Sequence, residues 1–81
     1  MNIQLTSTEF NYLILTFFTE RPDFRMFAGS DNVLSNIDED VVDEIRDWAG
    51  ERLQKVGFDE NYDLNQEGVI LDSIVDKLYI G

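Results

Sequence analysis

Seventeen aspartate and glutamate residues are the main chemically active groups of this 81-residue chain, which contains no cysteine and no histidine. Without these two residue types the chain lacks the commonest zinc ligands, the commonest general base and every Cys- or His-dependent catalytic triad. Carboxylates can still ligate calcium, act as a paired acid and base, or attract a cationic partner. The spacing of the acids decides among these three uses.

The stretch GFDENYDLNQEGVIL resembles a calcium-binding loop, because Asp59, Asn61 and Asp63 alternate in it. An EF-hand loop also needs glycine at its sixth position and a bidentate glutamate at its twelfth. Leu64 and Ile70 stand at those two positions. Because Asp and Asn side chains also bond their own backbone and cap helices, we interpret the stretch as a polar turn, with no metal and no cofactor.

A second group of acids lies on a helix that we predict from about residue 38 to residue 56. Its carboxylates recur at spacings of three and four residues and therefore share one face. With a neighbouring tryptophan they form the candidate partner-binding site, which comprises Asp40, Asp43, Glu44, Asp47, Trp48 and Glu51. We expect Arg46 to pair with Asp43 and Lys55 to pair with Glu51, which leaves most of these acids without a local partner. A merely solvated outer face is the alternative.

Catalysis by these acids is not expected. Paired carboxylates do acid–base work in a cleft that separates their pKa values, and a small helical domain has little room for one. The sequence also lacks a phosphate-binding glycine loop, a nucleophile motif and a basic nucleic-acid patch. We therefore expect a binding protein that is not an enzyme and does not bind nucleic acid directly.

The net charge of −11 exceeds the ~2 to 8 charges that suffice for the solubility of a small domain. Such a surface repels nucleic acid and anionic membrane and attracts cationic proteins. The opening residues lack the basic and apolar regions of a secretory signal. The longest apolar run, YLILTFF, is much shorter than a membrane span. We expect a cytoplasmic protein without membrane contact.

The apolar pattern predicts one all-α domain over residues 1–81, a compact bundle of three main helices. The first helix starts at a capping box formed by Thr6 and Glu9 and continues to Pro22, since the residue before proline avoids the α region. The second helix stops at Gly57, and Gly50 within it marks a kink or a close contact.

The third helix follows the polar turn, is capped by Asn65 or Asp63, and turns Asp72, Asp76 and Lys77 outward. Residues 22–36 predict a loop, and a fourth short helix within residues 24–34 is compatible with the same pattern. We expect the loop's Phe24, Met26 and Phe27 to fold back on the core, a binding surface being the alternative. The two β-prone ends, NIQL and LYIG, could pair as a ribbon.

The segments LTSTEFNYLILTFF and YDLNQEGVILDSIVDKLYI resemble parts of small acidic bacterial immunity proteins that neutralise nuclease toxins. The first is similar to the capped opening helix of colicin-type immunity proteins, and the second to contact-dependent-inhibition immunity proteins. The resemblance implies a nuclease toxin as partner and an acidic helix as its binding surface. The paired tyrosines of the colicin family have no counterpart here, because Tyr12, Tyr62 and Tyr79 are scattered.

Two functions follow as expectations. The first is an immunity protein or antitoxin that covers the basic surface of a cationic toxin. The second is a phage-type DNA mimic that inhibits a nucleic-acid-binding host enzyme. Both depend on the same electrostatic attraction.

We predict that calorimetric titration with micromolar calcium shows no stoichiometric binding, because Leu64 and Ile70 replace the glycine and glutamate of a calcium loop. The Asp59→Ala variant is the control. A clear binding heat that this variant loses would contradict the interpretation as a polar turn.

Overall fold

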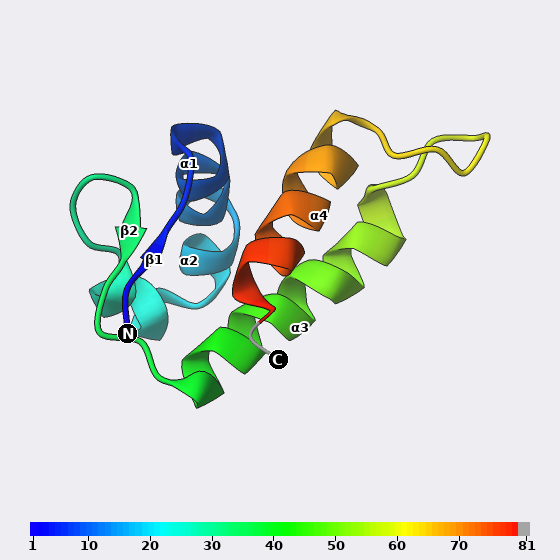
Figure 1. Ribbon diagram of the computed structural model, residues 1–81. Coiled ribbons are helices and arrows are strands. Elements are labelled where there is room, and N and C mark those ends of the chain that lie inside the picture. Colours follow the sequence, from blue (N-terminus) through cyan, green and yellow to red (C-terminus); the bar gives the residue numbers. More distant parts are fainter. Residues whose placement is uncertain (80–81) are drawn as a thin grey trace.

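The computed structural model describes residues 1–79 and consists mainly of helices (Figure 1). The elements in chain order are β1 (Ile3–Gln4), α1 (Ser7–Leu15), α2 (Phe17–Glu20), the 3-10 helix η1 (Pro22–Phe27), β2 (Val33–Leu34), α3 (Glu39–Val56) and α4 (Gln66–Leu78). The predicted helical bundle with three main helices, α1, α3 and α4, is confirmed. A two-stranded sheet is added to it.

Helix α1 begins at the predicted capping box. Glu9 N donates to Thr6 Oγ1 at 3.1 Å, and Thr6 N donates to Glu9 Oε1 at 2.8 Å. The prediction of one helix as far as Pro22 is wrong, because the chain breaks at Thr16, where φ is −120° and ψ is −79°. The Thr16 hydroxyl donates to the Tyr12 carbonyl at 2.6 Å, a bond that often bends helices. The chain continues as the separate short helix α2.

Residues 22–34 contain the short helix that was expected there, but it is the 3-10 helix η1 at the start of the segment. The segment ends in β2, which pairs antiparallel with β1 and places Ile3 opposite Leu34. Asp31 and Asn32 before β2 have φ values of 57° and 63°, the left-handed region that these residue types tolerate best. A ribbon between the segments NIQL and LYIG is not formed by the described residues, because Ile3 and Gln4 pair with β2 and Leu78 lies in α4. Residues 80–81 of the second segment lie outside the described residues.

The core lies where α1 and α2 meet α3 and α4, with β2 beside them. Its buried apolar residues are Leu5, Leu13, Phe17, Phe18, Leu34, Ile37, Val41, Val42, Ile45, Ala49, Leu71, Ile74 and Leu78. The loop aromatics pack inward as expected: the ring of Phe24 lies 5.4 Å from that of Phe17, and Phe27 stacks next to Phe24. Met26 does not follow them, since it is 77% exposed.

Helices α3 and α4 lie side by side along their length and are joined by a projecting loop (Figure 1). Helix α3 ends at Gly57 as predicted, although its φ of −86° is not left-handed. Close packing explains this glycine and Gly68 opposite it, because a Cβ added to Gly68 would lie 2.0 Å from the Gly57 carbonyl oxygen. The close contact expected at Gly50 is wrong: a Cβ added there meets no described atom within 4 Å.

The crowded position of Gly68 and the open position of Gly50 predict opposite effects of a glycine-to-alanine substitution on stability. Gly68→Ala should lower the free energy of unfolding by about 1–3 kcal/mol, because the new methyl group overlaps backbone that cannot move aside. Gly50→Ala should raise it by up to ~1 kcal/mol through helix propensity alone. Urea denaturation of both variants measures the difference, and a Gly68→Ala variant as stable as wild type would contradict the close contact.

Candidate functional site

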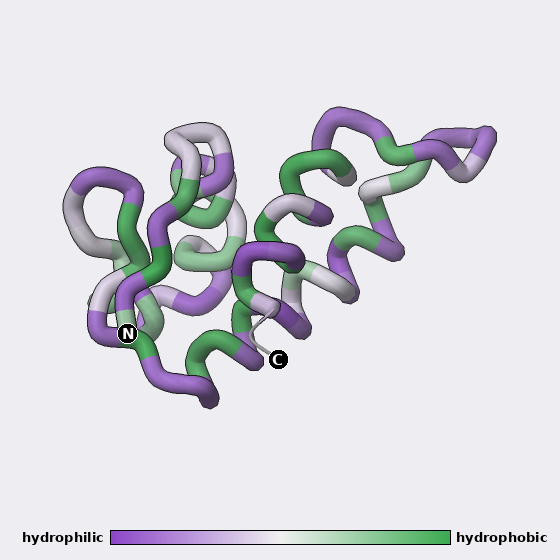
Figure 2. Tube along the Cα trace, viewed as in Figure 1, coloured by the Kyte–Doolittle hydropathy of each residue, from purple (hydrophilic) through white to green (hydrophobic). Residues whose placement is uncertain are grey.

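Helix α3 turns its predicted carboxylates to solvent, on the side opposite its buried residues. The exposed set, here called the acidic face, consists of Asp40, Asp43, Glu44, Asp47 and Glu51. Figure 2 shows hydrophilic residues along the edge of α3 that faces away from α4. Asp38 fixes the start of the helix, since its carboxylate accepts a hydrogen bond from Val41 N at 2.9 Å. The predicted acids are therefore brought together on one surface.

Only part of the acidic face is paired within the chain. The expected pair of Arg46 with Asp43 is confirmed, with an N–O distance of 2.7 Å. Arg21 approaches Glu44 at 3.5 Å, which the sequence did not indicate. The expected pair of Lys55 with Glu51 is not formed within residues 1–79.

Three acids of the face remain without compensation. Asp40, Asp47 and Glu51 form no ion pair with any of the described residues. Because exposed carboxylates without a counter-charge keep a negative potential near the surface, these three positions carry the uncompensated charge of the acidic face.

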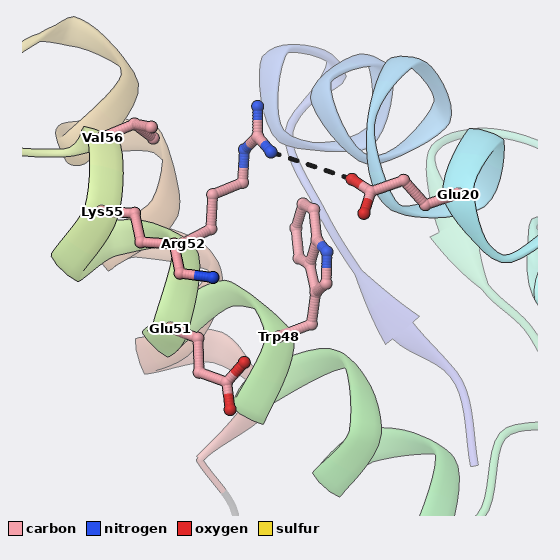
Figure 3. Close-up of a pocket in the computed structure, with 6 residues that line it drawn as sticks. All are labelled: Glu20, Trp48, Glu51, Arg52, Lys55 and Val56. Atoms are coloured by element: carbon pink, nitrogen blue, oxygen red, sulfur yellow. Dashed lines mark ion pairs between the residues drawn. The ribbon is translucent and has the colours of Figure 1, made fainter.

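Trp48, the sixth predicted site residue, lies at the border of the acidic face and packs inward. Its ring meets that of Phe17 edge-on at 5.3 Å, and the guanidinium of Arg52 lies 5.5 Å from its centroid. Figure 3 shows Trp48 and Arg52 turned toward Glu20 of α2, whereas the carboxylate of Glu51 points away from them. These residues line a hollow of ≈ 210 Å³. The indole thus joins α3 to α2.

Arg52 joins three other helices, a role that the sequence did not indicate. Its Nε donates to the Tyr12 hydroxyl at 2.8 Å and to Glu67 Oε2 at 3.2 Å, and its Nη1 lies 3.8 Å from Glu20. The Tyr12 hydroxyl donates in turn to Glu67. Burial and the bond to Glu67 raise the pKa of Tyr12 to about 12, although Arg52 acts in the opposite direction. The position of Tyr12 off the apolar stripe of α1 was the signal for this cluster.

Glu9 is a carboxylate buried between α1 and α4, with only 3% of its surface exposed. Besides its capping bond to Thr6 N, its Oε1 accepts from Lys77 Nζ at 2.6 Å, and its Oε2 accepts from the Ser73 hydroxyl. Burial by itself raises the pKa of Glu9, but the hydrogen bonds from Lys77, Ser73 and Thr6 outweigh it and leave the pKa lowered. Lys77 stays exposed as expected, but its ammonium group reaches back to the buried Glu9.

The stretch that resembles a calcium loop, residues 57–71, begins with a polar turn. Asp59 Oδ1 accepts hydrogen bonds from Asn61 N at 2.8 Å and from Asp63 N at 3.1 Å, and Asn65 caps α4 by accepting from Gly68 N. Tyr62 stands at its tip with φ at 62° and 86% of its surface exposed. Within residues 1–79 no three acidic side chains converge as metal ligands would.

Comparison of the chain with protein-family models, curated proteins and solved structures finds no match. Over residues 1–79, no helix has both the length and the apolar character required to cross a membrane.

The Glu9 contacts predict a pH-dependent loss of stability in the Glu9→Gln variant. Because the folded-state pKa of Glu9 lies below the ordinary value of 4.5, its stabilising contribution is fully present above that value. It disappears as the pH falls through the lowered pKa. At neutral pH the free energy of unfolding of the variant should be about 1–3 kcal/mol lower than that of wild type, since Lys77 and Ser73 lose a charged acceptor.

Chemical denaturation from pH 7 to pH 3 measures this difference, which should shrink in acid. Glu60→Gln, at an exposed position of the polar turn, is the matched control and should show almost no difference at any pH. A Glu9→Gln deficit that stays constant across the range would refute the assignment.

Proposed function

We propose that this protein is an acidic binding protein that neutralises a cationic toxin by covering the toxin's basic surface, as an immunity protein or antitoxin does. The observation that carries the proposal is the acidic face of α3, whose Asp40, Asp47 and Glu51 have no counter-charge among the described residues. Charged groups exposed in this way speed the encounter with an oppositely charged protein and select against other partners.

The distribution of basic residues supports the same function. Of the six in the chain, Arg21, Arg46, Arg52 and Lys77 form ion pairs with carboxylates of the chain. Most of the positive charge is therefore already engaged by the chain's own carboxylates, and the outer surface keeps its negative excess. The carboxylates lie exposed along one helix instead of converging in an enclosed cleft, which favours binding over acid–base catalysis.

A phage-type DNA mimic is the second candidate, and the spacing of the carboxylates favours it specifically. At ~1.5 Å of rise per residue, the five carboxylates from Asp40 to Glu51 follow one another along the helix axis at steps of about 1.5 to 6 Å, with a mean of about 4 Å. One strand of B-DNA places a phosphate about every 3.4 Å. A mimic would occupy the nucleic-acid site of a host enzyme, so duplex DNA would compete with it, whereas a toxin inhibitor that binds outside the active site would tolerate DNA.

We predict that the double reversal Asp40→Lys with Asp47→Lys slows association with the partner about tenfold or more at low salt, because rim charges act mainly on the association rate. Added salt should reduce the difference between variant and wild type. The partner is captured from the source organism with the wild-type chain and then purified, and the rates are measured by surface plasmon resonance.

The matched control is Glu60→Lys with Asp72→Lys, which changes the net charge by the same amount at two exposed positions outside α3. If both double variants bind equally fast, the acidic face contributes only general charge. If the α3 variant binds like wild type in low salt, the face is a solvated surface and the proposal fails.

A further inference from the structure

Gly50 occupies the middle of α3 although the chain's own packing does not require a glycine there. A Cβ at this position would meet no described atom within 4 Å, whereas one at Gly57 or Gly68 would collide with backbone. Glycine is the least favourable residue after proline in a helix interior. Because neither backbone conformation nor internal packing accounts for it, the open space that it leaves requires another explanation.

That space is a shallow groove of ≈ 390 Å³ beside α3, bordered on the other side by Val75 of α4. Its complete lining is Arg46, Asp47, Gly50, Glu51, Gln54 and Val75. Val75 is half-buried and packs against the core, so packing holds this apolar side of the groove in place. Gly50 provides bare backbone beside this wall, while Asp47 and Glu51 bring two carboxylates to the groove.

The charge at this groove is not neutralised from within the chain. Asp47 and Glu51 have no ion pair among the described residues, and Arg46, the basic residue of the lining, holds Asp43 at 2.7 Å. The groove therefore combines an apolar wall with a negative edge. Arginine and lysine side chains have the complementary form, since an aliphatic stem carries a cationic head.

We propose that the Gly50 groove receives an arginine or lysine side chain of the cationic partner. The stem lies over Gly50 against Val75, and the head group binds between Asp47 and Glu51. This inference rests on the proposed function and adds to it a defined anchoring position. A larger residue at position 50 would fill the place of the stem, which explains why a glycine that is unfavourable to the helix stands there.

Amide chemical-shift mapping of the labelled protein tests the groove without the natural partner. The probes are blocked tripeptides Gly-Arg-Gly and Gly-Lys-Gly at low ionic strength, with Gly-citrulline-Gly as the neutral control of equal shape. We expect saturable shifts at the amides of Gly50 and Val75 with both cationic probes. Citrulline should bind at least about five-fold more weakly, as the loss of an exposed charge contact implies.

The groove-filling variant Gly50→Leu separates this proposal from general attraction to the acidic face. It should lose the shifts at Val75 while remaining folded, because leucine is a good helix former. Asn11→Leu, at an exposed position of α1, is the matched control and should bind the probes as wild type does.

Two results would overturn the groove. One is the absence of a saturable shift at millimolar probe. The other is a set of equal shifts along Asp40, Asp43 and Glu44 that Gly50→Leu leaves unchanged. The second result would leave the acidic face standing as a binding surface, whereas unimpaired partner binding by the Asp40→Lys with Asp47→Lys variant overturns the face itself.

Discussion

The buried carboxylate of Glu9 is the contact on which the arrangement of the helices depends. It serves the start of its own helix through Thr6 and the distant α4 through Lys77 and Ser73. A buried carboxylate is strongly unfavourable unless its oxygens are hydrogen-bonded and a cation stands nearby. Both conditions are met only when α4 lies against α1 in one register. The Arg52 cluster repeats this arrangement farther along, joining Tyr12 of α1 to Glu67 of α4.

The same contacts decide where the few positive charges of a chain of net charge −11 are placed. Arg52 and Lys77 are drawn to carboxylates between elements, where a partly dehydrated ion pair is stronger than one in water. Helix α3 has apolar residues on its buried side, so its acids can only point outward. Mutual repulsion among them is then tolerated, because the exposed groups are screened by solvent and salt. The exposure of the acidic face is thus a consequence of how α3 packs in the bundle.

Most local signals predicted the local structure correctly, and the misses come both from distant residues and from one local bond that competes with a helix. The helix caps and stops needed only neighbours in the sequence: Thr6 and Gly57 were predicted correctly, and Asn65 is one of the two predicted caps of α4. Periodicity placed Lys77 correctly at an exposed position, but it could not indicate the bond to Glu9, which is 68 residues away. The break at Thr16 depends on one hydroxyl bond that competes with the helix.

The strand pairing and the acidic face show the same division. The turn at Asp31 and Asn32 has residue types that favour left-handed backbone. The strands that it accompanies are only two residues long, too short to show the alternating pattern by which a strand is predicted. The acidic face was predictable from spacing alone, since outward acids need no partner. The groove at Gly50 was not predictable from the sequence, because it depends on the position of Val75 on another helix.

The contact between Gly57 and Gly68 also separates the fate of the loop from that of the bundle. The two helix ends touch through bare backbone, so their separation is set by α3 and α4 and not by residues 58–64, which lie between Gly57 and the cap Asn65. A closed loop of this kind needs only to span a fixed gap, and even doubling its length costs about 0.6 kcal/mol in closure entropy. The loop between the helices is therefore the part of this chain where length and sequence are freest to diversify between descendants, while both glycines stay in place.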